Sequence, residues 1–579
     1  MDDKVIGFRR DAETYRKLAE ERNEAGDFTG AIGFLFEAKK LAPESFDVLM
    51  DIADTYADMN LLELSNQYWY YFLDKAPEDK YGIAYVELAI NFFYMKKIWA
   101  SGYYFHKKVS VDGYLSPDGI DPEITDYFAE MAGGKPEARI VYPSDKTDYE
   151  SIISKADRAA AEEDYERAIS LLESVPEDKR SEEVSGELAF MYFLCKKDDK
   201  LVEECRSSLN RHGENVTAYC NLSAYYADCK NIEKSFYYYS KALQCCKDKE
   251  KYAYKLATAA MDHADHVNVA EFTGIMIGKN RYDLPAYIMN GQAMINLGRY
   301  EEAEDAFSHA RRINPEDTVL QYYVNLSRRL QNGDKTAEKL LPLDYIDDLP
   351  AKEIALCKRA IKDYFTKNKL SAPRKAYIRD VVQYGADSAD AMMVKGSFLF
   401  GASEKGGVFS ERDYEFVYSL LMKTGVPAEV KSNIITILVN NGNRRRFGVV
   451  SGIYYVKIKP RKLVFRDKEN GAKFVAAYAE CLTRLAFAGI DDEGKLGFAI
   501  NKLYAERAED VEKTGLNERE IAAVTFIMSG ISGLLGAREA CIMFEADYNS
   551  VAEFIKLGEN IGFKMKGKSE RRNKDDKNN

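Results

Sequence analysis

The sequence predicts an all-α fold: an α-solenoid of helix hairpins, followed by a mostly helical C-terminal domain that contains one β-hairpin. Small residues recur about every 34 positions on successive amphipathic helices, and Pro43 recurs as Pro77 after the same interval. This period is lost beyond about residue 340. A period of this length is typical of stacked helical hairpins, each of which buries its apolar face only against its neighbours.

The composition is that of a globular protein. The 579 residues are 46% apolar and 30% charged, and they include 14 Pro. The net charge of −12 disfavours a surface that attracts nucleic acid as a whole. The first residues, MDDKVIGFRRD, lack the apolar segment of a secretory signal, and the nine cysteines include no C-x-x-C pair. We therefore expect a cytoplasmic protein without a disulfide framework.

Residues 1–112 are predicted to form an N-terminal array of helix pairs. The first unit carries a small residue, Ala19, on the apolar face of its first helix and turns at Gly26. Ala19 recurs as Ala53 after 34 residues, and a looser third copy contains Ala89.

A linker containing Pro and Gly, residues 113–148, is expected before a second array over residues 149–331. Small residues recur in this array at steps of 33, 34, 34 and 34, on the helix face that packs against the partner helix. They are Ala156, Ala189, Ser223, Ala257 and Gly291. A last helix, residues 318–331, is expected to cap the exposed end of the stack.

From about residue 12 to 331 the chain resembles the tetratricopeptide repeat (TPR) family over eight units. The units that match its pattern best end at Pro43, Leu243 and Pro315. The resemblance implies a right-handed superhelix whose concave groove, lined by the first helix of each pair, holds a partner peptide or helix; it implies no reaction. Asn60 and Lys96 stand where the turn Gly of the family is usual, so the second and third units depart from the pattern.

One TPR binding mode grips a carboxylate terminus with Lys and Asn side chains from three consecutive first helices. The resemblance places Asn221, Lys251 and Lys255 at the second-unit and third-unit positions, but Gly186 and Phe190 stand at the first-unit positions. A complete clamp is therefore not expected. Lys251 and Lys255 share one helix face, so they either meet an acidic ligand or are solvated surface lysines.

The matching positions of the N-terminal array hold mostly acids. They are Arg16, Glu20, Asp51 and Glu87. These side chains would repel a carboxylate, so we expect a basic or apolar partner in that groove.

Residues 340–563 are predicted to form a C-terminal domain without the 34-residue period. An uncharged stretch, residues 521–537, is expected to form a buried helix pair broken near Ser529 and Gly530 rather than a membrane span. A basic tail, residues 564–579, is predicted to be disordered. The expected helices are residues 351–367, 389–400, 411–422, 427–440, 472–487, 495–511 and 550–561.

Within this domain, residues 447–466 are predicted to form a basic β-hairpin that turns at Pro460. The cations in and beside it are Arg444, Arg445, Arg446, Lys457, Lys459, Arg461, Lys462 and Arg466, with Tyr454, Tyr455 and Phe465 between them. Such a surface can follow a phosphate backbone and stack bases. The alternative is a hairpin edge that Lys and Arg protect against strand pairing.

The sequence contains no motif of a known catalytic site. It has no P-loop, G-x-G-x-x-G or G-x-S-x-G pattern, and of its five histidines only His263 and His266 are close together. We expect no cofactor and no metal ion. The leading hypothesis is a non-enzymatic scaffold that binds a partner peptide or helix in the groove; the alternatives are a nucleic-acid or ribonucleoprotein adaptor that uses the hairpin, and an enzyme with a site in residues 340–563.

Overall fold

The computed structural model describes residues 11–112, 149–335, 337, 355, 359, 411–463, 468–487, 493–531 and 537–559, apart from the single positions 162, 427, 441 and 444. The chain divides into two compact units, residues 1–350 and 351–579. The predicted linker, the tail and the helix at residues 389–400 lie outside the described residues, and so does nearly all of the helix predicted at residues 351–367.

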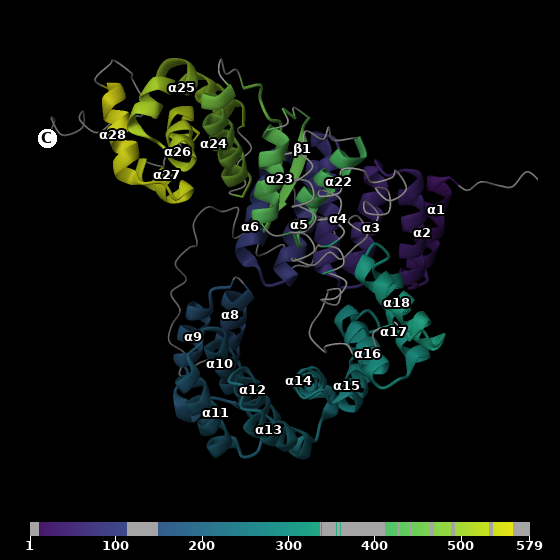
Figure 1. The fold of residues 1–579 in the computed structure, drawn as a ribbon. Coiled ribbons are helices and arrows are strands. Elements are labelled where there is room, and N and C mark those ends of the chain that lie inside the picture. Colours follow the sequence, from purple (N-terminus) through teal and green to yellow (C-terminus); the bar gives the residue numbers. More distant parts are fainter. Residues whose placement is uncertain are drawn as a thin grey trace, which may run out of the picture. The chain divides into compact units, whose positions relative to one another are not determined.

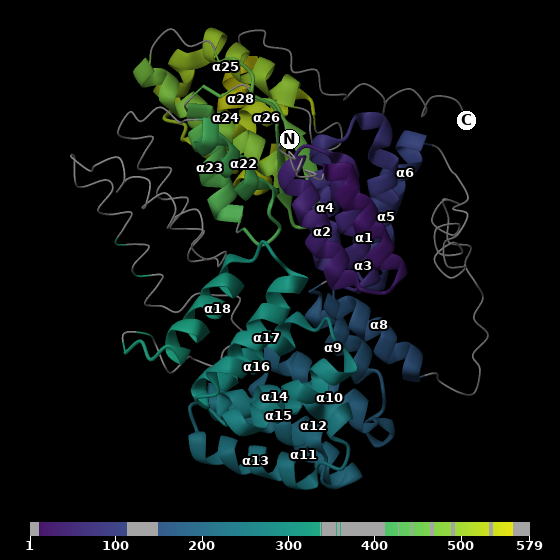
Figure 2. The ribbon, with the colours of Figure 1, turned by 90° about the vertical axis from the view of Figure 1, so that its right-hand side faces the viewer.

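The described part of the first unit consists of eight helix pairs in chain order and a capping helix, as predicted (Figures 1 and 2). The N-terminal array contains α1 (Ala12–Glu24) and α2 (Phe28–Leu41), α3 (Phe46–Asp58) and α4 (Leu62–Lys75), and α5 (Tyr81–Tyr94) and α6 (Ile98–Asp112). The second array contains α8 (Tyr149–Ala161) and α9 (Tyr165–Glu173), α10 (Glu182–Leu194) and α11 (Asp198–His212), α12 (Val216–Asp228) and α13 (Ile232–Cys245), α14 (Lys249–Asp262) and α15 (His266–Lys279), and α16 (Leu284–Asn296) and α17 (Tyr300–Ile313), with α18 (Thr318–Gln331) as the cap. Short 3₁₀ turns, Glu78–Lys80 and Glu177–Lys179, precede α5 and α10.

In each pair, the turn between the two helices contains one residue in the left-handed backbone conformation, which ends the first helix. In the first pair the Asp27 N–H donates to the Arg22 carbonyl at 2.8 Å and the Gly26 N–H donates to the Asn23 carbonyl at 2.9 Å, which is the Schellman pattern. The residue with positive φ in the eight turns is Gly26, Asn60, Lys96, Glu163, Lys196, Lys230, Ala264 and Gly298. The second and third units therefore keep the turn of the family, although they lack its glycine.

The small residues of the repeat are buried where the two helices of a pair meet. Ala19, Ala53, Ala89, Ala156, Ala189, Ser223 and Ala257 are all 3% exposed or less. At Gly291 a Cβ atom would lie 2.6 Å from the Phe307 ring of the partner helix. The predicted positions thus set how closely the helices approach each other.

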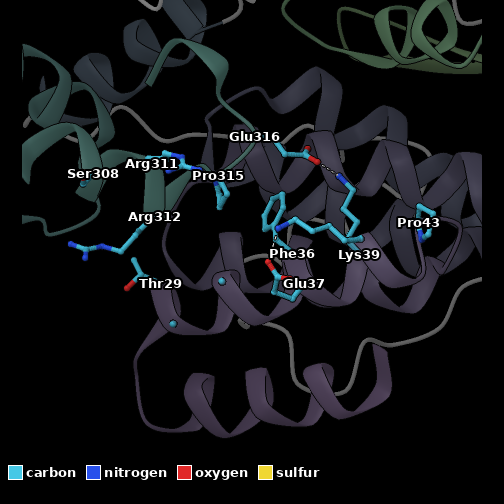
Figure 3. Close-up of a pocket in the computed structure, with 13 residues that line it drawn as sticks. Thr29, Phe36, Glu37, Lys39, Pro43, Ser308, Arg311, Arg312, Pro315 and Glu316 are labelled. Atoms are coloured by element: carbon cyan, nitrogen blue, oxygen red, sulfur yellow. Dashed lines mark hydrogen bonds and ion pairs between the residues drawn. The ribbon is translucent and has the colours of Figure 1, made fainter. Parts of the chain in front are cut away.

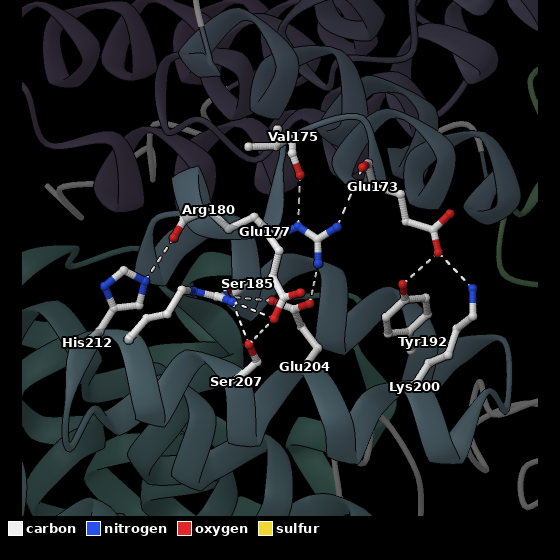
Figure 4. Close-up of polar contacts among 11 residues, drawn as sticks. Glu173, Val175, Glu177, Arg180, Ser185, Tyr192, Lys200, Glu204, Ser207 and His212 are labelled. Carbon is white, nitrogen blue, oxygen red and sulfur yellow. Dashed lines mark hydrogen bonds and ion pairs between the residues drawn. The ribbon is translucent and has the colours of Figure 1, made fainter.

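A buried carboxylate joins the pairs at the start of the second array (Figure 4). Glu204 of α11 forms ion pairs with Arg180 and with Arg211. Arg211 also donates to the Ser185 hydroxyl of α10 at 2.8 Å, and Arg180 donates to the Val175 carbonyl at 3.0 Å. No sequence motif indicates this network, which connects α11 to α10 and to the loop after α9.

The second unit packs helices around a two-stranded hairpin and has its own apolar core. Its elements are α22 (Glu411–Met422), α23 (Ala428–Asn440), β1 (Phe447–Ser451), β2 (Tyr454–Ile458), α24 (Lys468–Phe487), α25 (Glu493–Thr514), α26 (Glu518–Ser529), α27 (Ala537–Phe544) and α28 (Tyr548–Glu559). Antiparallel pairing runs from Phe447 opposite Ile458 to Ser451 opposite Tyr454. The hairpin is confirmed, but its predicted turn at Pro460 is wrong: the chain reverses at Gly452, whose φ of 56° suits glycine.

The predicted break near Ser529 and Gly530 in the uncharged stretch is confirmed, because α26 ends at Gly530, which has a φ of 65°. The second helix predicted within the stretch stays a prediction, since residues 532–536 lie outside the described residues and α27 begins at Ala537, the last residue of the stretch. Ile521 and Phe526 of α26 are completely buried in the core of the second unit. Over the residues described, no helix combines the length and the apolar character that crossing a bilayer requires.

Candidate functional site

Several first helices contact the first helix of the next pair. Helix α1 contacts α3, α10 contacts α12, and α12 contacts α14. In Figure 1 the helices α10, α12, α14 and α16 follow the inner side of the curve of the second array, while α11 and α13 follow its outer side. The candidate site is therefore the face of these first helices that points away from their partners.

The residue after each small residue marks this face, because one step along a helix turns by about 100° away from the pair interface. We call these the groove positions; they are Glu20, Asp54, Ile90, Asp157, Phe190, Ala224, Thr258 and Gln292. Glu20, Asp54 and Phe190 are exposed, whereas Gln292 on α16 is 0% exposed. The groove is thus open on α1, α3 and α10 and closed on α16.

The three predicted partner-binding residues lie together, but two of them already have protein contacts. Asn221 Nδ2 donates to the Gly186 carbonyl at 3.0 Å. Lys255 Nζ lies 4.0 Å from Glu187 Oε1, and this charge partly offsets the effect of burial, which raises the pKa of Glu187. Lys251 is exposed, with its ammonium group 5.3 Å from the centroid of the Tyr252 ring. A role for these residues in binding an acidic partner stays a prediction.

The N-terminal array carries an acidic cluster on its first helices. Asp51, Asp54 and Asp58 are three and four residues apart and so share one face of α3, and Glu87 of α5 lies near enough to act on Asp54. Asp51 is paired with Arg16, whose Nη2 donates to Asp51 Oδ1 at 3.2 Å. Within the residues described, no Lys or Arg forms an ion pair with Asp54, Asp58 or Glu87.

Three of these carboxyl groups, Asp54, Asp58 and Glu87, have raised pKa values, and burial is the first cause for each. Asp54 stays accessible to solvent, but crowding by the surrounding protein, followed by the charges of Glu87, Asp51 and Asp58, raises its pKa to about 7. Burial also raises the pKa of Glu87 and of Asp58. A neighbouring cation would reverse these shifts, so the cluster favours a positively charged ligand.

Helix α5 carries a strip of apolar side chains on the same face as Glu87. Ile83 is 40% exposed and Tyr94 is 54% exposed, and Ile90, half-buried, lies between them on the same helix face. The groove of the N-terminal array therefore combines carboxylates on α1 and α3 with apolar side chains on α5. Of these, Glu20 and Glu87 were identified from the sequence; Asp54 was not, although its place directly after Ala53 marks it as a groove position.

The side chains of the basic hairpin are less exposed to solvent than its sequence suggests. Arg445, Arg446, Lys459, Arg461 and Lys462 are exposed, Lys457 is half-buried, and Arg444, Phe465 and Arg466 lie outside the described residues. Tyr455 is only 6% exposed, because β2 is covered on both faces, so it cannot stack on a base. Nucleic-acid contact through this hairpin stays a prediction.

The second unit also anchors the hairpin through a buried lysine. Lys431 of α23 is 1% exposed and donates from Nζ to the Lys423 carbonyl at 2.6 Å and to the Val450 carbonyl of β1. Burial lowers its pKa to about 7. Because both acceptors are backbone groups of the same core, these contacts hold β1 against α23.

His263 and His266 belong to different helices. His263 is the C-cap of α14 and His266 is the first residue of α15. His263 Nε2 lies 3.2 Å from the Ser223 hydroxyl and 3.1 Å from the Ser235 hydroxyl, both completely buried. Its surroundings therefore give it a structural role between α12, α13 and α14.

No family model and no curated protein sequence matches the chain. Among solved structures it is similar to yeast Tom70, with 12% identity over 87% of this chain and 96% of that chain and a TM-score of 0.31. It is also similar to the P58(IPK) TPR domain, with 13% identity over 56% of this chain and 99% of that chain and a TM-score of 0.23. A third similar structure is the TPR2AB domain of yeast Sti1 in a complex with pHSP90, with 13% identity over 57% of this chain and 97% of that chain and a TM-score of 0.18. At these TM-scores the likenesses carry no argument. The helix pairs, their turns and their buried small residues define residues 12–112 and 149–331 as a TPR-type α-solenoid.

Proposed function

We propose that the protein is a non-enzymatic interaction scaffold whose N-terminal array binds a partner segment along α1, α3 and α5. The partner carries basic side chains that meet Glu20, Asp54 and Asp58, and adjacent apolar side chains that cover Ile83 and Tyr94. A peptide or helix of this kind fits the open face of successive first helices.

The observation that carries this proposal is that Asp54, Asp58 and Glu87 form no ion pair with any described Lys or Arg. Burial and neighbouring carboxylates raise the pKa of Asp54, so its charged form destabilises the folded chain, and local conflicts of this kind are concentrated where a protein performs its function. A cationic partner would remove the conflict, and the exposed strip on α5 supplies apolar area for affinity.

The test is the binding of a labelled synthetic peptide with an Arg-rich half and a Leu- and Phe-rich half, measured by fluorescence anisotropy. We expect saturable binding that weakens with salt, and loss of binding in the variant D54K/D58K. The matched control is E301K/D305K, which makes the same charge change at two exposed acids one turn apart on the second helix α17. Equal affinity for D54K/D58K and the wild type, or equal binding of a peptide with Glu in place of Arg, would contradict the proposal.

A further inference from the structure

The N-terminal array contacts the end of α17 and the residues just beyond it, and we call this contact the seam. The Tyr56 hydroxyl donates to the Ile313 carbonyl at 3.0 Å. Glu316, just beyond α17, accepts from Lys39 Nζ at 2.7 Å and from the Tyr68 hydroxyl at 2.8 Å. Tyr56 and Tyr68 are both buried, so the seam is a packed contact between the first helix pairs and the last.

A pocket of about 880 Å³ lies beside this seam, between α2 and α17 (Figure 3). Lys39 and Lys40 line it from α2, and Arg311 and Arg312 line it from α17. Thr29 and Ser308 also line it. Basic side chains therefore line the same pocket from two helices.

The positive charge of this pocket is only partly neutralised. Its two acids are each paired with a lysine: Glu316 with Lys39, and Glu37 with Lys40 at 2.5 Å. Arg311 and Arg312 are exposed and form no ion pair with any described residue. Two arginines that line one pocket without a carboxylate partner, in a chain of net charge −12, mark a local site for an anion.

The wall contributed by α2 leaves open space at Gly33. Gly33 lies inside this helix and lines the pocket, and a Cβ atom placed on it would meet nothing within 4 Å. Packing therefore does not explain a glycine there, although glycine weakens a helix interior. Its effect is to leave room for a ligand above the helix.

We propose that this pocket binds a small polyphosphate anion, a ligand with two or more linked phosphate groups. Arg311 and Arg312 hold phosphate groups from α17 by charge-assisted hydrogen bonds, and Lys40 holds a linked phosphate from α2. The ligand bridges α2 and α17 and so strengthens the seam between the two arrays. This site is separate from the proposed peptide groove on α1, α3 and α5.

The test uses the full chain and inorganic tripolyphosphate in isothermal titration calorimetry. We expect one site per chain, and an affinity that falls by about tenfold or more in the variant R311A/R312A. The matched control R328A/R329A removes two adjacent arginines of α18 that already pair with Glu304 and Asp334, and it should bind as the wild type does.

A second variant, Gly33→Glu, covers the case in which R311A/R312A fails to fold. It places a carboxylate in the pocket while improving the helix propensity of α2, so binding should be lost and the melting temperature kept. Several weak sites per chain, equal affinity in all variants, or equally tight binding of inorganic sulfate would overturn the proposal.

Discussion

Gly291 of α16 faces the ring of Phe307 of α17 so closely that a Cβ atom would lie 2.6 Å from both Cε2 and Cζ. Phe307 in turn stacks on Tyr323 of α18 with ring centroids 4.9 Å apart. The last helix pair and its cap are thus packed around one residue that has no side chain. This contact shows in atomic detail why the repeat requires a small residue at every pair.

Gly291→Ala should lower the stability of the first unit by about 1 to 3 kcal/mol, because the added methyl group forces Phe307 out of its packed position. Thermal unfolding followed by circular dichroism measures the loss. The double variant G291A/F307L should recover part of it, since a smaller side chain leaves space for the methyl group. An unchanged melting temperature for Gly291→Ala would show that the helices are not in this register.

Ala264→Gly should stabilise the chain by about 0.5 to 1 kcal/mol. Ala264 has a φ of 50° in the turn between α14 and α15, and this left-handed conformation costs an alanine more than it costs a glycine. The control is Ala270→Gly inside α15, which should destabilise by about 1 kcal/mol. If both substitutions destabilise to the same extent, the turn at Ala264 does not have the left-handed conformation.

Asp54→Asn should change how stability depends on pH. The pKa of Asp54 is about 7 in the folded chain, above its ordinary value of 3.8, so the folded state binds more protons than the unfolded state between these values. The stabilisation from the protonated carboxyl is complete below about pH 4 and is lost as the pH rises through 7. The melting temperature of Asp54→Asn should therefore exceed that of the wild type at pH 8 and lose this advantage at pH 5. The control is Asp305→Asn at an exposed position of α17, and an equal effect of pH on the two variants would contradict the assignment to Asp54.

Glu204→Ala should destabilise the second array by about 3 to 5 kcal/mol. The substitution leaves Arg180 and Arg211, which are mostly buried, without their shared carboxylate. Chemical denaturation measures the change, and Glu203→Ala, at the exposed neighbouring position, should remain within about 0.5 kcal/mol of the wild type. Equal effects at the two positions would mean that the ion pairs add nothing to stability.

The repeat could be predicted because its cause is local. Only a small residue lets two helices approach, so Ala156, Ala189, Ser223 and Ala257 recur at nearly constant spacing and are all buried. The turns were harder to predict, since Lys96 and Lys230 take a conformation that favours glycine. There the surrounding helix pair, rather than the residue's own preference, determines the backbone.

The site was only partly predictable. The acidic character of the N-terminal groove follows from the sequence, but Asp51, the acid named on α3, is paired with Arg16, and Asp54 is the residue that remains unpaired. The contact of Lys39 with Glu316 joins positions 277 residues apart. No pattern along the chain indicates such a contact, because it arises only once the pairs stack and curve.

The most direct test of the proposed groove is hydrogen–deuterium exchange of the full chain with and without the Arg- and Leu/Phe-rich peptide. The account predicts added protection in α1, α3 and α5, centred on Asp54 and absent in D54K/D58K, with α10, α12 and α14 unchanged. Protection confined to α10–α14 or to the β1–β2 hairpin would contradict it, and so would a peptide that binds without protecting α3.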